Sequence, residues 1–392
     1  MTFAKSTLRP ALGLAVLFTL VLTAGSVVAD DGHPVAIRHW EGQSFTIETM
    51  WGFQIGLGVD EANQSKLPRK PDLILSAVSA GESSTLQRLP NQAKLSISSE
   101  PPASEDGNAV VVSRGKDDSV SSVTVDGLTI VFLNDATATA VLNQLKADSE
   151  KPLGLSSKGE QLVVVASGAE YDEAACTAIA ESLKPRLMVV NSGVKKIGEQ
   201  AVESVSHNTV AVSNTKRKKT ITRVVSLGTK TYEMSAALKD LFDKKEASCK
   251  KSRATFAALS IAQMNFKPAN GTHTPRWNTE HMMGRELQFF SQIYHAVDPE
   301  VPVINLNPAQ MPPKYKFAHP DWTGQEEALQ TERVQQFTRR FAYLLDGMSL
   351  NKKAKGSRFW TPRSLLAQME RHYKEHTANV VDKMKLEGWP EE

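Results

Sequence analysis

The sequence predicts an α/β sandwich followed by an all-α four-helix bundle, and three observations support this prediction. The chain has 392 residues, which suits two domains. Residues 30–235 alternate short apolar runs with polar turns, whereas residues 236–392 carry long helical patterns. A hydrophobic content of 41% and a charged content of 23% are typical of globular proteins and give no support to a disordered or fibrous chain. We therefore expect an α/β domain at residues 30–235 and a helical domain at residues 236–392.

The first 29 residues predict a secretory signal peptide that is cleaved. Lys5 and Arg9 give it a positive start, residues 11–22 are apolar, and residues 27–29 end in a small side chain. The apolar run is interrupted by Thr19 and is short for a membrane span. We therefore expect a periplasmic or extracellular protein with no membrane contact after cleavage.

Charge and cysteine content narrow the function further. Of the 46 basic residues, two lie in the leader. The remaining basic residues almost balance the 43 acidic residues, so the mature chain is almost neutral. This balance gives no electrostatic basis for binding nucleic acid. The two cysteines, Cys176 and Cys249, are too few for a disulfide framework, and the sequence leaves open whether they pair.

Strand patterns dominate the first domain. Short apolar runs bounded by polar turns predict strands at residues 36–38, 44–48, 53–57, 72–75, 122–125, 129–133, 162–166 and 186–190. Asp126-Gly127 between two of these runs predicts a hairpin. Residues 172–183 predict a helix between the last two strands. Strands interleaved with helices indicate an α/β sandwich.

Four segments of this domain follow one another in a familiar order: RHWEGQSFTIET at residues 38–49, PDLIL at 71–75, FLNDAT at 132–137, and the strand–helix–strand unit from residue 162 to 193. They resemble, in turn, the opening hairpin, the strand before the metal loop, the strand that ends in a ligand aspartate, and the last unit of the metallo-β-lactamase fold, in its ascorbate-lactonase-like branch. The resemblance implies that scaffold for the first domain.

The ligands of that family do not carry over. Its His-x-His-x-Asp-His loop and its later histidines correspond here to Val78, Ala80, Glu82, Ser83, Glu170 and Asn191. Asp135 alone keeps a ligand type. Valine and alanine side chains have no lone pairs, so a dinuclear site with a bridging hydroxide is not expected. The first domain is therefore predicted to be a pseudoenzyme.

Helical patterns define the second domain. They predict helices at residues 236–264, with a break near Ser248, at about 277–295, with Asn278 as the cap, at 325–345, and from Thr361-Pro362 onward. A proline-rich connection at residues 298–321 joins the second and third helices. Four helices with one long crossover indicate a bundle.

The last helix carries the strongest candidate site. Leu365, Met369, His372, His376 and Val380 recur at the spacing of one helical face, with charged residues on the flanks. Two neutral imidazoles one turn apart can converge on one metal ion.

WNTEHMMGREL at residues 277–287 and RHYKEH at residues 371–376 resemble the DinB-like (YfiT-like) bundle family. That family places one histidine on its second helix and a His-x-x-x-His pair on its last helix, and together they hold a divalent metal with open positions. The resemblance implies that His281, His372 and His376 bind one divalent ion. Imidazole ligands suit Zn²⁺ and Ni²⁺ alike.

The helical wheel leaves the third ligand open. The apolar stripe of the second helix runs through Met283, Leu287, Phe290 and Tyr294, and His281 points roughly 180° away from Phe290 on a wheel of about 100° per residue. His281 lies at the start of the helix, where bundle ends splay apart. The alternative third ligands are Glu280, Glu286 and His295.

Two classes of function follow. In the first, the bundle is a metal-dependent hydrolase or thiol-dependent transferase that takes a small molecule at the metal. In the second, the chain is a non-catalytic two-domain binding or structural protein with a structural metal or none. A homodimer is compatible with either class.

Overall fold

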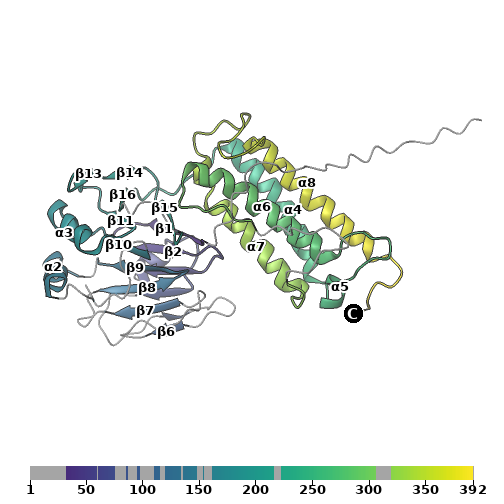
Figure 1. The fold of residues 1–392 in the computed structure, drawn as a ribbon, viewed down its shortest axis with the longest axis horizontal. Coiled ribbons are helices and arrows are strands. Elements are labelled where there is room, and N and C mark those ends of the chain that lie inside the picture. The colour runs from purple at the N-terminus through teal and green to yellow at the C-terminus, as the bar shows by residue number, and fades with distance from the viewer. Residues whose placement is uncertain are drawn as a thin grey trace, which may run out of the picture.

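The computed structural model describes residues 32–59, 61–75, 85–86, 95–97, 110–114, 120–133, 136–147, 153, 161–215, 222–305 and 319–391. The expected leader and the loop positions Val78, Ala80, Glu82, Ser83 and Asp135 lie outside these ranges. Within them, a mixed α/β part up to residue 235 precedes a helical part that starts at Ala236 (Figure 1). The predicted fold class is confirmed at that level. No helix in the described ranges has both the length and the hydropathy of a membrane span.

The first sheet contains the predicted opening meander. Its described strands are, in spatial order, β15 (Thr209–Ser213), β1 (Pro34–His39), β2 (Phe45–Glu48), β3 (Gln54–Leu57), β4 (Leu73–Leu75) and β5 (Thr85–Leu86). Strands β1, β2 and β3 pair antiparallel, and β4 joins β3 in parallel. Strand β15, which was not predicted, pairs antiparallel with β1 and so brings the end of the α/β part back to its beginning.

The second sheet carries the strand–helix–strand unit. Its described strands are, in spatial order, β14 (Glu203–Val205), β16 (Arg223–Leu227), β11 (Leu187–Val190), β10 (Leu162–Ala166), β9 (Leu128–Phe132), β8 (Ser121–Val125), β7 (Val110–Arg114) and β6 (Leu95–Ile97). The predicted hairpin joins β8 to β9. Asp126 and Gly127 form its turn with φ values of 48° and 71°, the left-handed conformation that a tight hairpin needs. Strands β12 (Lys196–Ile197) and β13 (Gln200–Ala201) form a separate ribbon, and α1 (Glu61–Gln64) is a single turn.

The two sheets pack face to face, and helices cover the outer face of the second sheet. Along β10, Val163 and Val165 join the core between the sheets, whereas Leu162, Val164 and Ala166 face helices α2 (Ala138–Ala147) and α3 (Glu173–Leu183). This burial on both faces explains why β10 reads as an unbroken apolar run. Asp172 caps α3 by accepting a hydrogen bond from the Ala175 amide.

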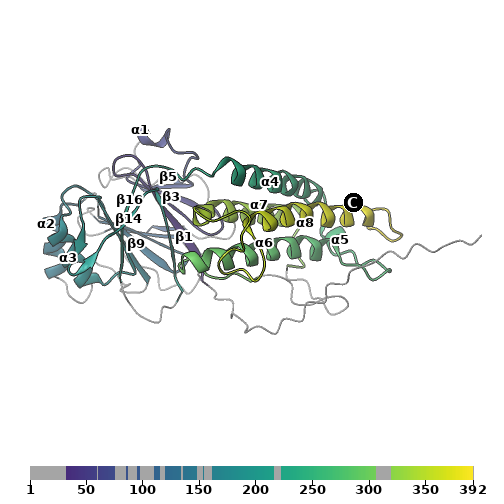
Figure 2. The ribbon, with the colours of Figure 1, turned by 90° about the horizontal axis from the view of Figure 1, so that it is seen from above.

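Four long helices pack against one another in the helical part. They are α4 (Ala236–Ala257), α6 (Pro275–Val297), α7 (Gly324–Arg340) and α8 (Pro362–Lys383). Both α4 and α6 contact α7 and α8, so the four run side by side (Figure 2). The short helix α5 (Ile261–Met264) follows α4, and a 3₁₀ turn at Ala342–Leu345 follows α7.

Several predicted helix limits are corrected by the structure. The first helix is unbroken at Ser248 and ends at Ala257, because Ser260 starts α5 with a capping box. The second helix starts at Pro275, not near Asn278, because the Thr274 hydroxyl accepts from the Trp277 amide and Pro275 occupies the first helical position. The third helix ends at Arg340 rather than residue 345. The predicted Thr361-Pro362 start of α8 is confirmed.

One end of the helical part abuts the outer face of the first sheet. Ala36 of β1, Ala211 of β15 and Met50 belong to the same apolar cluster as side chains of α6, α7 and α8. The two alanines allow the helices to approach the sheet closely. Ion pairs between the α/β part and the helical part join Arg186 to Glu300 at 2.8 Å, Arg223 to Asp298 at 3.0 Å and Glu48 to Arg340 at 2.7 Å.

Candidate metal centre

The predicted face of α8 is buried as expected. Leu365, Met369 and Val380 are fully enclosed, and His372 between them is 8% exposed. His376, one turn further on, is half-buried. Helix α6 runs antiparallel to α8, and the last residues of α6 lie near the sheets. The first turns of α6 therefore lie beside the second half of α8 (Figure 1). The candidate site therefore lies in the half of the helical part that is far from the sheets.

The structure brings His281, His372 and His376 together. One ligand nitrogen from each ring lies within 4.8 Å of the others, so the group could hold a metal ion. The ring centroids of His281 lie 5.1 Å from His372 and 5.2 Å from His376, and those of His372 and His376 are 4.4 Å apart. In the described part of the chain this is the one group of three such side chains.

His281 reaches the pair although the helical wheel placed it on the opposite side from Phe290. The wheel assumed one buried stripe, but the first two turns of α6 are buried almost all round. Met282 packs in a cluster with Phe256 of α4 and Tyr373 of α8, whereas Met283 belongs to the larger cluster that includes Phe290. A helix enclosed on several sides offers its polar side chains more than one partner, so the position of its apolar stripe does not exclude His281.

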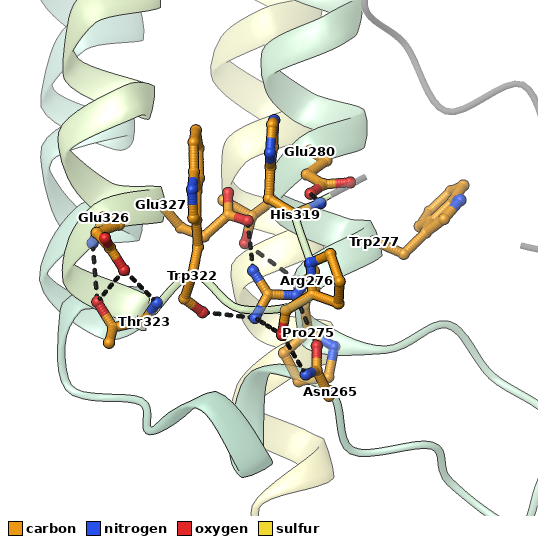
Figure 3. A network of polar contacts seen from close by, with 12 residues as sticks. Asn265, Pro275, Arg276, Trp277, Glu280, His319, Trp322, Thr323, Glu326 and Glu327 are labelled. Atoms are coloured by element: carbon orange, nitrogen blue, oxygen red, sulfur yellow. Dashed lines mark hydrogen bonds and ion pairs between the residues drawn. The ribbon is translucent and has the colours of Figure 1, made fainter. Parts of the chain in front are cut away.

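The three alternative ligands lie outside the histidine group. Glu280 accepts a hydrogen bond from the His319 backbone amide at 3.2 Å and faces Arg276 and Glu327 in the network of Figure 3. Glu286 forms a fully buried ion pair with Lys245 and accepts from the Tyr373 hydroxyl at 2.7 Å. His295 donates its Nδ1 proton to the Val301 carbonyl at 3.0 Å. Each of these side chains is therefore held elsewhere.

Asn278 orients one of the three imidazoles. Its side-chain amide Nδ2 donates to the Thr274 carbonyl at 2.7 Å, so its Oδ1 faces His376 Nδ1 at 2.6 Å. An amide oxygen can only accept, so Nδ1 of His376 carries the proton and Nε2 keeps its lone pair. A hydrogen bond of this kind fixes both the tautomer and the ring direction of a metal-binding histidine. Asn278 was expected to cap the helix from outside its first turn, so this role was not predicted from the sequence.

A column of stacked rings encloses His281. The Trp277 indole lies between His273 and His281, with centroid distances of 3.6 Å and 4.4 Å and interplanar angles of 28° and 11°. The Nδ1 atom of His281 is buried and has no hydrogen-bond partner among the described residues. A buried nitrogen without a partner is costly, and coordination of an ion would remove this cost.

The environment keeps all three imidazoles neutral. Burial is the largest cause in each case, and it lowers the pKa of His281 to about 2, of His372 to about 4 and of His376 to about 3. Neighbouring rings and cations lower these pKa values further. Neutral imidazole is the form that binds a metal.

The geometry fits an ion after small side-chain movements. A tetrahedral Zn²⁺ ion lies about 2.0–2.1 Å from each nitrogen ligand, so two ligands lie about 3.4 Å apart. The present separation of up to 4.8 Å requires shifts of the order of 1 Å. Rotations about the histidine side-chain bonds cover such distances.

The α/β part offers no comparable group in its described residues. Glu170, which the sequence resemblance aligned with a metal-binding histidine, is exposed. Asn191, at another, donates from Nδ2 to the carbonyls of Gly168 and Tyr171 at 3.1 Å, and so holds a loop together.

Both cysteines are free and buried, which answers the question of pairing. Cys176 lies on the buried face of α3, and Cys249 packs in a cluster with Phe256 in the helical part. Burial raises the pKa of each thiol to about 12, so neither is a thiolate at neutral pH.

In comparisons with known proteins, no protein-family model, no curated protein and no solved structure matches the chain.

Proposed function

We propose that the helical part is a DinB-like four-helix bundle that binds one divalent ion, Zn²⁺ or Ni²⁺, through His281, His372 and His376. We further propose that the site serves a metal-dependent hydrolase or transferase reaction in an exported protein. The observation that carries the proposal is the convergence of three neutral imidazoles from two helices. The leader pattern of residues 1–29 supports export.

The chemistry follows from the donor set. A three-histidine ion keeps at least one position for water or substrate, acts as a Lewis acid and lowers the pKa of a bound water or thiol. The chain supplies three fixed lone pairs, and Asn278 orients one of them. Glu280 and Glu286 have polar partners of their own, so no described carboxylate shares in binding the ion.

We propose that the α/β part is a metallo-β-lactamase-like scaffold without its metal chemistry. Two sheets packed face to face, with helices outside, support the scaffold. The exposed Glu170 and the loop-bound Asn191 support the loss of its ligands. We expect no lactonase or β-lactamase turnover even in excess zinc.

A structural metal in a non-catalytic protein is the second candidate. The burial of His372, which is 8% exposed, favours it. In this case the ion would hold α6 to α8 and take no substrate.

Activity and stability measured together separate the two candidates. The mature protein would be compared with and without Zn²⁺ and with His376→Ala, against panels of esters, lactones, phosphoesters and thiol acceptors. An enzyme would show turnover that chelation and His376→Ala abolish while the fold is retained. A structural site would show a zinc-dependent rise in the melting temperature, absent in His376→Ala, and no turnover. A melting temperature that does not respond to zinc, without turnover, contradicts both.

A further inference from the structure

Arg285, beside the candidate metal centre, is a cation that has no counter-ion among the described residues. It follows His281 by four residues on α6, so both side chains leave the same face of the helix. Arg285 is half-buried. Its guanidinium donates to Gln288 Oε1 at 3.4 Å and lies over the Phe289 ring, 5.7 Å from the centroid. Both partners are neutral.

Two fully enclosed arginines of the described chain, by contrast, pair with carboxylates: Arg186 with Glu300 and Arg340 with Glu48. Among the described residues, no acidic side chain forms an ion pair with Arg285. Burial without a counter-ion lowers the pKa of Arg285, but an arginine remains charged at any physiological pH. A partly desolvated charge of this kind attracts an anion.

The other charges near the histidines also favour an anionic ligand. Arg285 and His281 are four residues apart on α6, so their side chains leave the helix about 5–6 Å from each other. Glu286 is the acidic group that acts on His372, and its charge is already balanced by Lys245. Three neutral ligands would leave the full charge of a divalent ion uncompensated.

We propose that the natural ligand of this centre carries a small oxyanion group, a carboxylate or a phosphate, which Arg285 binds beside the metal. This inference rests on the proposed metal site and narrows its substrate class. A guanidinium presents parallel N–H donors that match the two oxygens of such a group. The role of Arg285 is to hold the charged end of the substrate, while the histidines hold the ion.

The test uses the full mature protein loaded with Co²⁺, whose visible absorption reports the ligands of a three-histidine ion. Inorganic phosphate and acetate are titrated separately at constant ionic strength, and their two dissociation constants decide between the two oxyanions. The variants are Arg285→Met, which removes the charge, and Arg285→Lys, which keeps it. Arg371→Met is the matched control, because Arg371 is an exposed cation next to His372 that pairs with Glu375.

We expect Arg285→Met to weaken binding of the preferred oxyanion by about 10-fold or more, the usual value of a charged hydrogen bond. Arg285→Lys should retain part of the affinity, and Arg371→Met should change it by no more than about 2-fold. Every variant should still bind cobalt, and loss of the positive charge in Arg285→Met should not weaken cobalt binding. Oxyanion binding that is unaltered in Arg285→Met, or no spectral response to either anion in the cobalt protein, overturns the inference alone. Failure of the wild-type protein to bind cobalt overturns the proposed function as well.

Discussion

Removing the side-chain amide of Asn278 should weaken metal binding without touching a ligand. In Asn278→Ala, His376 loses the acceptor 2.6 Å from its Nδ1 atom, so its ring can turn and the proton can move to the nitrogen that faces the ion. Loss of such an orienting hydrogen bond typically costs about 10–100-fold in metal affinity. This corresponds to about 1.4–2.8 kcal/mol. In the same variant, the Thr274 carbonyl loses the hydrogen bond from the side-chain amide of Asn278, 2.7 Å away. Some loss of stability is therefore also expected.

The assay is a zinc titration in competition with a chromophoric chelator at pH 7.5. Thr279→Ala is the matched control, because Thr279 is the next residue along α6, is equally buried, and donates only to the Pro275 carbonyl of its own helix. Unfolding of both zinc-free variants shows how much of any change is due to stability. If folded Asn278→Ala binds zinc as tightly as Thr279→Ala, Asn278 does not orient His376 and the account of this hydrogen bond is wrong.

Three further predictions concern protons and charges. Burial lowers the pKa of all three histidines to about 4 or less, so zinc affinity should be nearly constant from pH 7.5 to 5.5. Three imidazoles of ordinary pKa would lose about 10³-fold in zinc affinity over the same range. A pH series of the chelator titration distinguishes these two results. Burial and the neighbouring Glu280 raise the pKa of Glu327 from 4.5 to about 8, so the stability that Glu327 contributes is complete below pH 4.5 and is lost as the pH rises through 8. Glu327→Gln should therefore flatten this part of the curve of unfolding free energy against pH. An unchanged slope in Glu327→Gln contradicts the assignment. Burial raises the pKa of Glu48, but the charges of Arg340 and Arg38 outweigh it and lower that pKa to about 2. Arg340→Met should therefore cost about 3–5 kcal/mol in urea unfolding, against at most about 1 kcal/mol for its half-buried neighbour Arg339→Met.

The last helix was the part of the site that the sequence predicted best. Its cap, its first-turn proline and its stripe of Leu365, Met369, His372 and Val380 are local patterns that depend only on helical geometry, and the structure has each of them. The hairpin at Asp126-Gly127 was predictable for the same reason, since the turn conformation is set by the residues that form it.

Features that depend on packing between distant segments were harder to predict. The position of His281 beside α8 follows from burial of α6 on several sides, which a single helical stripe does not represent. Lys245 and Glu286 belong to different helices, and both are fully buried as an ion pair. A charged side chain can be assigned to the interior only when its partner, here 41 residues away, is known to be near.

The start of α6 shows how one local error concealed a functional residue. Asn278 and Thr274 are both acceptable cap residues, and the Pro275 that follows Thr274 was the stronger signal. With the start moved to Pro275, Asn278 falls inside the helix, three residues before His281, and its side chain is free to reach His376. The same Thr-Pro pattern was recognised at Thr361-Pro362.

The central claim is that three histidines of the helical part hold one divalent ion, and metal analysis of the purified mature protein tests it most directly. Elemental analysis after incubation with Zn²⁺ or Ni²⁺ and desalting should find one ion per wild-type chain. His281→Ala, His372→Ala and His376→Ala should each retain little metal. The control is His295→Ala: His295 lies on the same helix as His281 but donates to the Val301 carbonyl, so this variant should retain all of the metal. A wild-type protein without stoichiometric metal, or a His281→Ala protein as fully loaded as His295→Ala, would contradict the three-histidine site.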